Sequence, residues 1–136
     1  MNSKACIHYW IGFLSITGGI LFTIGSVVYW PTLTYINPNT GGILFIIGST
    51  FYFVCDILSG FVDPAFTPFK PLQNIGSLRT FLSMLGNLSF IIGSVYFLPA
   101  LPAIVGEDIF IIGSIFIWIP QILTCWGLYA TNTFTA

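Results

Sequence analysis

Residues 41–49 read GGILFIIGS, an apolar run framed by small residues. The chain contains this pattern four times, each time as a glycine, six further residues and then Gly-Ser. The copies are Gly18 to Gly25-Ser26, Gly41 to Gly48-Ser49, Gly86 to Gly93-Ser94 and Gly106 to Gly113-Ser114. Because seven residues are nearly two turns of an α-helix, the two glycines of each copy share one helical face. The recurrence therefore predicts four helices, each with a shallow groove of small residues along one side.

The composition indicates that these helices cross a membrane. Of the 136 residues, 56% are hydrophobic and 5% are charged, which leaves too few charges to cover a water-soluble protein of this size. The uncharged stretches run over residues 5–55, 80–106 and 109–136. About 20 helical residues cross a bilayer core of roughly 30 Å. We therefore expect an all-α membrane protein with four transmembrane helices, at residues 9–30, 41–58, 78–98 and 108–128.

The second half of the chain repeats the first. An offset of 68 residues places Phe22 on Phe90, and an offset of 65 residues places Phe45 on Phe110, with further identities around each. The repeated unit is a helical hairpin, so both copies cross the membrane in the same direction, and a pseudo-two-fold axis along the membrane normal should relate them. The predicted regions are a first hairpin at residues 1–58, an interfacial connecting loop at 59–77 and a second hairpin at 78–136.

All three basic residues fall on one side of this arrangement. Lys4 precedes the first span, and Lys70 and Arg79 lie between the second and third spans. By the positive-inside rule, we expect both termini on the cytoplasmic side. The cysteines fall near the same face, where thiols stay reduced: Cys6, Cys55 and Cys125.

Small residues let membrane helices approach closely, so we assign the glycines and serines of the four copies to helix packing. Counted from the predicted outer ends of the spans, Gly25 and Gly48 lie at the same depth and should meet across the first hairpin. The second hairpin should repeat this contact, which would form one layer of four glycines and four serines. In an alternative interpretation, polar residues line a narrow path: Asn87, Ser26, Ser49, Ser94 and Ser114.

Three other residues have local interpretations. Asn87 is the most polar residue deep in a predicted span, and an interhelical hydrogen bond is favoured over ligand contact for its side chain. His8 stands at the inner membrane boundary, where it is interpreted as an interfacial anchor. Pro120 should kink the fourth span.

Chemical groups are sparse in the predicted spans. No ionisable residue falls in the middle of any of them, although ion-coupled transporters and proton relays generally place one there. No metal-ligand spacing, activated nucleophile, phosphate-binding loop or basic patch is present. We therefore expect no enzyme activity, no catalytic or metal-binding residues, no cofactor and no nucleic-acid partner. The expected partners are the lipid bilayer and either a second copy of the chain or other membrane proteins.

Two stretches carry a resemblance to a known family. Residues 42–49, GILFIIGS, and residues 90–94, FIIGS, each end an apolar run with Gly-Ser. Each hairpin resembles the YrhK-like domain, a two-helix membrane module with Gly-Ser in each helix, over about residues 19–58 and 86–123. The resemblance implies a tandem pair of membrane modules without an established activity. We expect a structural or accessory component of a membrane assembly, and the alternative is a small-solute or ion pathway formed by the repeats or by an oligomer.

Overall fold

The computed structural model describes residues 3–29, 37–62 and 75–131. These residues form four α-helices and no strand. The helices are α1 (Ser3–Val28), α2 (Pro38–Val62), α3 (Ile75–Tyr96) and α4 (Ala103–Thr131). Each contains a stretch that is long and apolar enough to cross a membrane. The all-α fold of four transmembrane helices is therefore confirmed.

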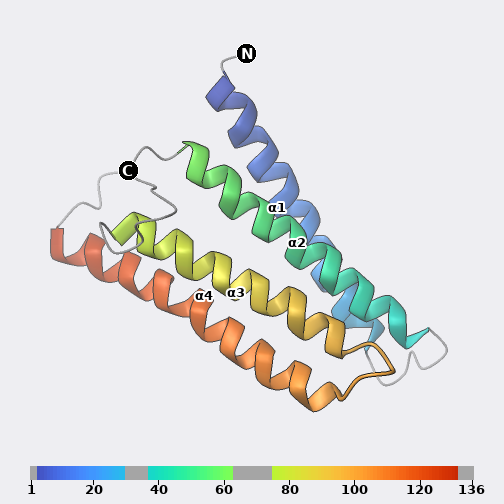
Figure 1. The fold of residues 1–136 in the computed structure, drawn as a ribbon. Helices are drawn as coiled ribbons and strands as arrows, with labels where there is room; N and C mark the ends of the chain where they lie inside the picture. Colours follow the sequence, from blue (N-terminus) through green and yellow to red (C-terminus); the bar gives the residue numbers. More distant parts are fainter. Residues whose placement is uncertain (1–2, 30–36, 63–74, 132–136) are drawn as a thin grey trace.

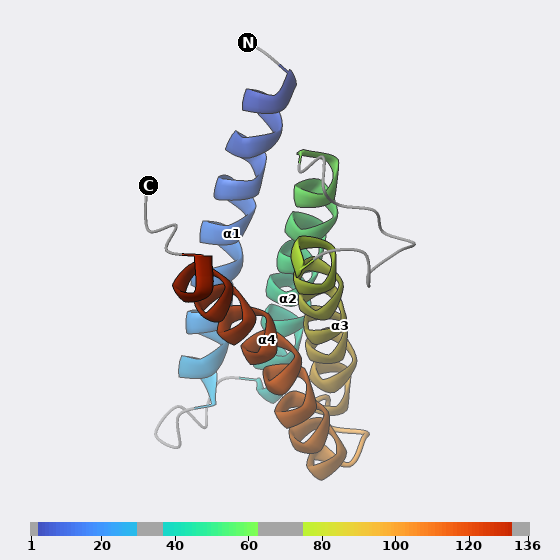
Figure 2. The ribbon, with the colours of Figure 1, turned by 90° about the vertical axis from the view of Figure 1, so that its left-hand side faces the viewer.

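Consecutive helices run antiparallel, so that α1 and α2 form one hairpin and α3 and α4 form the other (Figure 1). Extensive interfaces join α1 to α2, α2 to α3 and α3 to α4. Within the described residues, α1 and α4 share no interface of similar extent. Figures 1 and 2 show the two hairpins drawing apart toward the end of the bundle where the N-terminus lies. We call this the splayed end, and the opposite end the hairpin-turn end.

The observed helices reach further than the predicted spans at the splayed end. Helix α1 begins at Ser3, and α2 continues to Val62, four residues beyond the predicted end of the second span. The predicted connecting loop at residues 59–77 is therefore too long, since α2 and α3 take residues from both of its ends. The middle of that loop, including Lys70, lies outside the described residues.

A proline and an asparagine set the start of α2. Pro38 occupies the first helical position, where the missing N–H of proline removes no helical hydrogen bond. The Asn39 backbone N–H donates to Asn37 Oδ1 at 3.0 Å, as at a capped helix N-terminus. Helix α2 therefore begins at Pro38, three residues before Gly41, whereas the apolar pattern predicts a start at Gly41.

The glycines bring helix backbones together, but not in the predicted pairs. A Cβ atom added at Gly48 would lie 3.1 Å from the Gly18 carbonyl oxygen, and one at Gly25 would lie 3.4 Å from the Gly41 oxygen. The expected meeting of Gly25 with Gly48 is therefore wrong. Gly25 and Gly41 each lie three residues from the hairpin-turn end of their helix, whereas Gly18 and Gly48 each lie ten residues from it. The prediction failed because depth was counted from Gly41 rather than from the true start of α2.

The second hairpin has the same two contacts at equivalent positions. A Cβ atom at Gly113 would lie 3.1 Å from the Gly86 oxygen, and one at Gly106 would lie 2.9 Å from the Gly93 oxygen. Adding the offsets of 68 and 65 residues to the glycines that meet in the first hairpin gives the glycines that meet in the second hairpin. The bundle therefore has two levels of glycine contact instead of one layer of glycines and serines.

Six aromatic side chains, which we call the aromatic cluster, pack between the hairpins. The same offsets relate them in three pairs: Phe22 with Phe90, Tyr29 with Phe97, and Phe45 with Phe110. The rings of each pair are in contact, with centroids 6.2, 6.0 and 6.0 Å apart. Equivalent side chains touch one another only close to the axis that relates them. The pseudo-two-fold axis therefore passes through the aromatic cluster.

Candidate functional site

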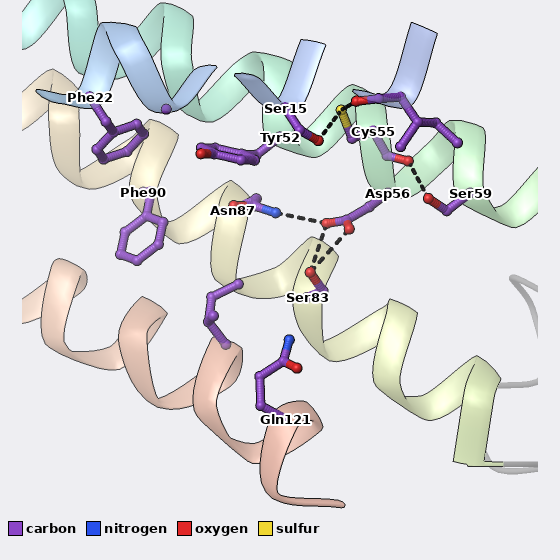
Figure 3. A pocket seen from close by; sticks show the side chains of 13 residues that line it. Ser15, Phe22, Tyr52, Cys55, Asp56, Ser59, Ser83, Asn87, Phe90 and Gln121 are labelled. Atoms are coloured by element: carbon purple, nitrogen blue, oxygen red, sulfur yellow. Dashed lines mark hydrogen bonds between the residues drawn. The ribbon is translucent and has the colours of Figure 1, made fainter. Parts of the chain in front are cut away.

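A cavity of about 620 Å³ adjoins the aromatic cluster on the side of the splayed end (Figure 3). All four helices contribute to its walls. The polar lining comprises Ser15 from α1, Asp56 and Ser59 from α2, Ser83 and Asn87 from α3, and Gln121 from α4. The aromatic lining comprises Phe22, Tyr52 and Phe90. We call this space the central cavity.

Asp56 places a carboxylate in the central cavity from within a transmembrane helix. It lies six residues before Val62, which is about 9 Å inside the end of α2 at 1.5 Å per residue. Asn87 Nδ2 donates to Asp56 Oδ2 at 2.7 Å, and the Ser83 hydroxyl lies 3.1 and 3.0 Å from the two carboxylate oxygens. These bonds join α2 to α3 and so link the two hairpins. The interhelical hydrogen bond expected for Asn87 is confirmed.

The carboxylate of Asp56 keeps hydrogen-bonding capacity toward the cavity. A carboxylate offers about four lone-pair positions, whereas Ser83 has one hydroxyl proton to share between its two contacts. Among the described residues, no basic side chain acts on Asp56 as a charge partner. An acidic side chain inside a membrane span costs roughly 2.5 to 3.5 kcal/mol or more, so its presence there marks a candidate functional group.

Two smaller hollows continue the central cavity toward the splayed end. One, of about 200 Å³, shares Asp56 and Ser59 with the central cavity and is also lined by Arg79. The other, of about 290 Å³, shares Ser59 and Arg79 with the first and is also lined by His8. Because His8 and Arg79 lie within the first two turns of α1 and α3, the hollows lead from Asp56 to the end of the bundle where these helices begin.

Cys55 and Ser15 join α1 to α2 at the wall of the cavity. The Ser15 hydroxyl donates to Cys55 Sγ at 3.4 Å. The Cys55 thiol in turn donates to the Ile11 carbonyl oxygen at 3.4 Å. The Ser59 hydroxyl donates to the Cys55 carbonyl oxygen at 2.8 Å. These polar groups therefore have partners within the protein, and Asp56 is the one charged side chain that the described residues contribute to the lining of the central cavity.

The serines of the Gly-Ser pairs do not line the central cavity. Each donates its hydroxyl to the carbonyl oxygen four residues earlier in its own helix, at 2.6–2.8 Å. Ser49 and Ser94 are fully buried, Ser114 is half-buried and Ser26 is exposed. Of the five residues expected as an alternative polar lining, the structure brings Asn87 alone to the cavity.

Sequence reasoning missed Asp56 because this residue lies only two positions before the predicted end of the second span, where a charged side chain is expected to reach water. A signal was present in the repeat. The two offsets relate polar and small residues of the cavity in pairs: Asp56 with Gln121, Ser15 with Ser83, and Gly19 with Asn87. Because both members of each pair line the central cavity, the cavity lies on the same pseudo-two-fold axis as the aromatic cluster.

Four apolar helices around an intramembrane carboxylate define a small multi-pass membrane protein with a polar central cavity. Residues 74–123, which cover α3 and most of α4, match the family described as YrhK-like protein. The match does not extend over the first hairpin, so the expected tandem pair of YrhK-like modules is not confirmed. No curated protein and no solved structure matches the chain.

Proposed function

We propose that the protein binds a small solute in its central cavity and forms a small-solute or ion pathway. The observation that supports this proposal is the carboxylate of Asp56, which faces a cavity inside the membrane and has only Ser83 and Asn87 as partners among the described residues. Transporters built from repeats place their binding sites near mid-membrane at the interface between the repeats. Asp56 occupies such an interface. The proposed role is binding and passage rather than catalysis.

The shape of the bundle supports entry from the splayed end. The two smaller hollows connect Asp56 with that end, where Lys4 and Arg79 also lie. On the opposite side the aromatic cluster closes the cavity, since Phe22 and Phe45 have ring centroids 5.2 Å apart and the equivalent rings of the second hairpin are 5.0 Å apart. Aromatic rings at these separations are in direct contact. Passage across the membrane would therefore require the aromatic cluster to separate.

Solute flux into liposomes that contain the full-length protein tests the proposal. Asp56→Asn removes the charge and keeps the shape of the side chain, whereas Asp108→Asn makes the same change at an exposed position near the start of α4. We expect flux of small ions or neutral solutes above that of protein-free liposomes for the wild type and Asp108→Asn, and reduced flux for Asp56→Asn. Background flux in all three folded proteins would contradict a pathway.

A structural or accessory role is the second candidate. It is supported by the large apolar side chains that α1 and α4 expose on the outside of the bundle, including Ile20, Ile24, Ile111 and Ile115. These surfaces suit lipid, a second copy or another membrane protein. Isolation from native membranes in mild detergent tests this role, since a monodisperse monomer without a co-purifying protein would contradict it.

A further inference from the structure

We infer that the central cavity binds an organic ammonium ion, with its charged group at Asp56 and its apolar group against Phe22, Tyr52 and Phe90. This inference rests on the proposed function, because it names the class of solute that the same cavity takes.

The cavity is polar on one side and aromatic on the other. Figure 3 shows Asp56 and Ser83 on one side, Phe22 and Phe90 on the other, and Tyr52 between them. The order along the helices agrees, since Tyr52 lies one turn from Asp56 in the direction of the hairpin-turn end. A molecule that fills the cavity must therefore be polar or charged at one end and apolar at the other.

The volume favours an organic molecule over a bare metal ion. A cavity of about 620 Å³ falls within the range of roughly 300 to 1,000 Å³ that is usual for sites that enclose organic ligands. A dehydrated alkali ion is instead held by a close ring of oxygen atoms that replaces its water. Asn87 directs its Nδ2 donor, not its oxygen, at the Asp56 carboxylate. This arrangement stabilises the carboxylate without building an oxygen cage around a metal ion.

The charge and the aromatic wall favour an ammonium group. Asp56 has no basic charge partner among the described residues, so a cation from outside can supply the missing positive charge. Substituted ammonium ions are also attracted to the faces of aromatic rings. The ring of Phe22 lies 6.0 Å from that of Tyr52 and 6.2 Å from that of Phe90, measured between centroids, so the three rings form one continuous wall. Arg79 is exposed and lines the smaller hollows, so it lies on the route of entry rather than in the central cavity.

Binding of benzyltrimethylammonium to the full-length protein in lipid nanodiscs tests the inference. Neopentylbenzene is the matched neutral compound, because a carbon atom replaces the ammonium nitrogen. We expect saturable binding of the cation by the wild type and Asp108→Asn, and binding about ten- to a hundredfold weaker by Asp56→Asn, as for loss of a contact to a charged group. The neutral compound should enter protein-containing and empty nanodiscs equally.

Two results would overturn the inference: cation binding that Asp56→Asn leaves unchanged, or neopentylbenzene that binds as tightly as the cation. If Asp56→Asn does not yield folded protein, the comparison of cation with neutral compound on the wild type decides. Asp56-dependent flux of alkali ions without binding of benzyltrimethylammonium would overturn the inference and leave the proposed pathway in place. Absence of both flux and binding would contradict both.

Discussion

Replacement of Gly106 by alanine tests whether backbone contact between α3 and α4 stabilises the second hairpin. The new Cβ atom would lie 2.9 Å from the Gly93 carbonyl oxygen and 3.1 Å from Tyr96 Cβ. Both atoms belong to or adjoin the backbone of α3, so the two helices must move apart by several tenths of an ångström. Overpacking of this kind costs about 1–3 kcal/mol, and alanine recovers about 0.5–1 kcal/mol through its higher helix propensity. The difference between these two ranges is about 0–2.5 kcal/mol, so we expect a net loss of about 1 kcal/mol in the free energy of unfolding.

Gly12→Ala is the matched control, because a Cβ atom at Gly12 would meet nothing within 4 Å. This change also places alanine inside a transmembrane helix, so its free energy of unfolding should be unchanged or slightly raised. Both variants can be unfolded with sodium dodecyl sulfate in mixed micelles and followed by circular dichroism. If Gly106→Ala is as stable as Gly12→Ala, close approach of the helix backbones at this level does not stabilise the hairpin, and the packing argument is refuted.

A double substitution sharpens the same test. A Cβ atom at Gly93 would lie 3.2 Å from the Gly106 oxygen, so each glycine limits the space of the other. Helices already separated by one alanine accommodate the second more easily. The combined loss for Gly93→Ala with Gly106→Ala should therefore be smaller than the sum of the two single losses, and strict additivity would count against a shared contact.

Three further measurements address the site and its surroundings. Asn87→Ala should lower the free energy of unfolding by about 1 kcal/mol, because it removes an interhelical hydrogen bond. Ser49→Ala should leave the free energy of unfolding nearly unchanged, because the Ser49 hydroxyl bonds only within its own helix. Equal losses for the two variants in the detergent titration would contradict this distinction. In the folded protein a maleimide should label exposed Cys125 before buried Cys55, as read by mass spectrometry of proteolytic fragments, and equal rates would show that the wall of the cavity is loose. Arg79→Gln should strengthen binding of benzyltrimethylammonium a few-fold, because it removes a like charge from the route of entry, and weaker binding would contradict that route.

The transmembrane helices and their hairpin order could be predicted because both follow from local properties. Apolar runs of sufficient length cross a membrane wherever they occur, and the two offsets identify the repeated hairpin. The level at which the glycines meet could not be predicted in this way, because it depends on where each helix begins. The cap formed by Asn37 and the position of Pro38 determine that level, and both lie before the apolar pattern starts.

The site was harder to predict than the fold because its contacts join distant parts of the chain. A buried amide in lipid must find a partner, so the hydrogen bond of Asn87 could be expected. Its partner could not, since Asp56 lies 31 residues earlier and near the predicted end of a span. The contact also requires the second hairpin to pack against the first, and the apolar pattern of a single helix does not contain that information.

The aromatic cluster and the central cavity both lie on the pseudo-two-fold axis, but only in the aromatic cluster do all equivalent positions carry similar residues. Packing explains this difference. In the aromatic cluster each ring touches its own equivalent, so a smaller side chain in either hairpin would leave a void, and three aromatic pairs are retained. The central cavity imposes no such requirement, and there Asp56 stands opposite Gln121 and Gly19 opposite Asn87. A second carboxylate at Gln121 would place two like charges around one cavity inside the membrane, whereas Gln121 keeps the polarity without the repulsion. Among the residues that the structure describes, the central cavity therefore presents a single negative charge, which is the property that the proposed binding of one cation requires.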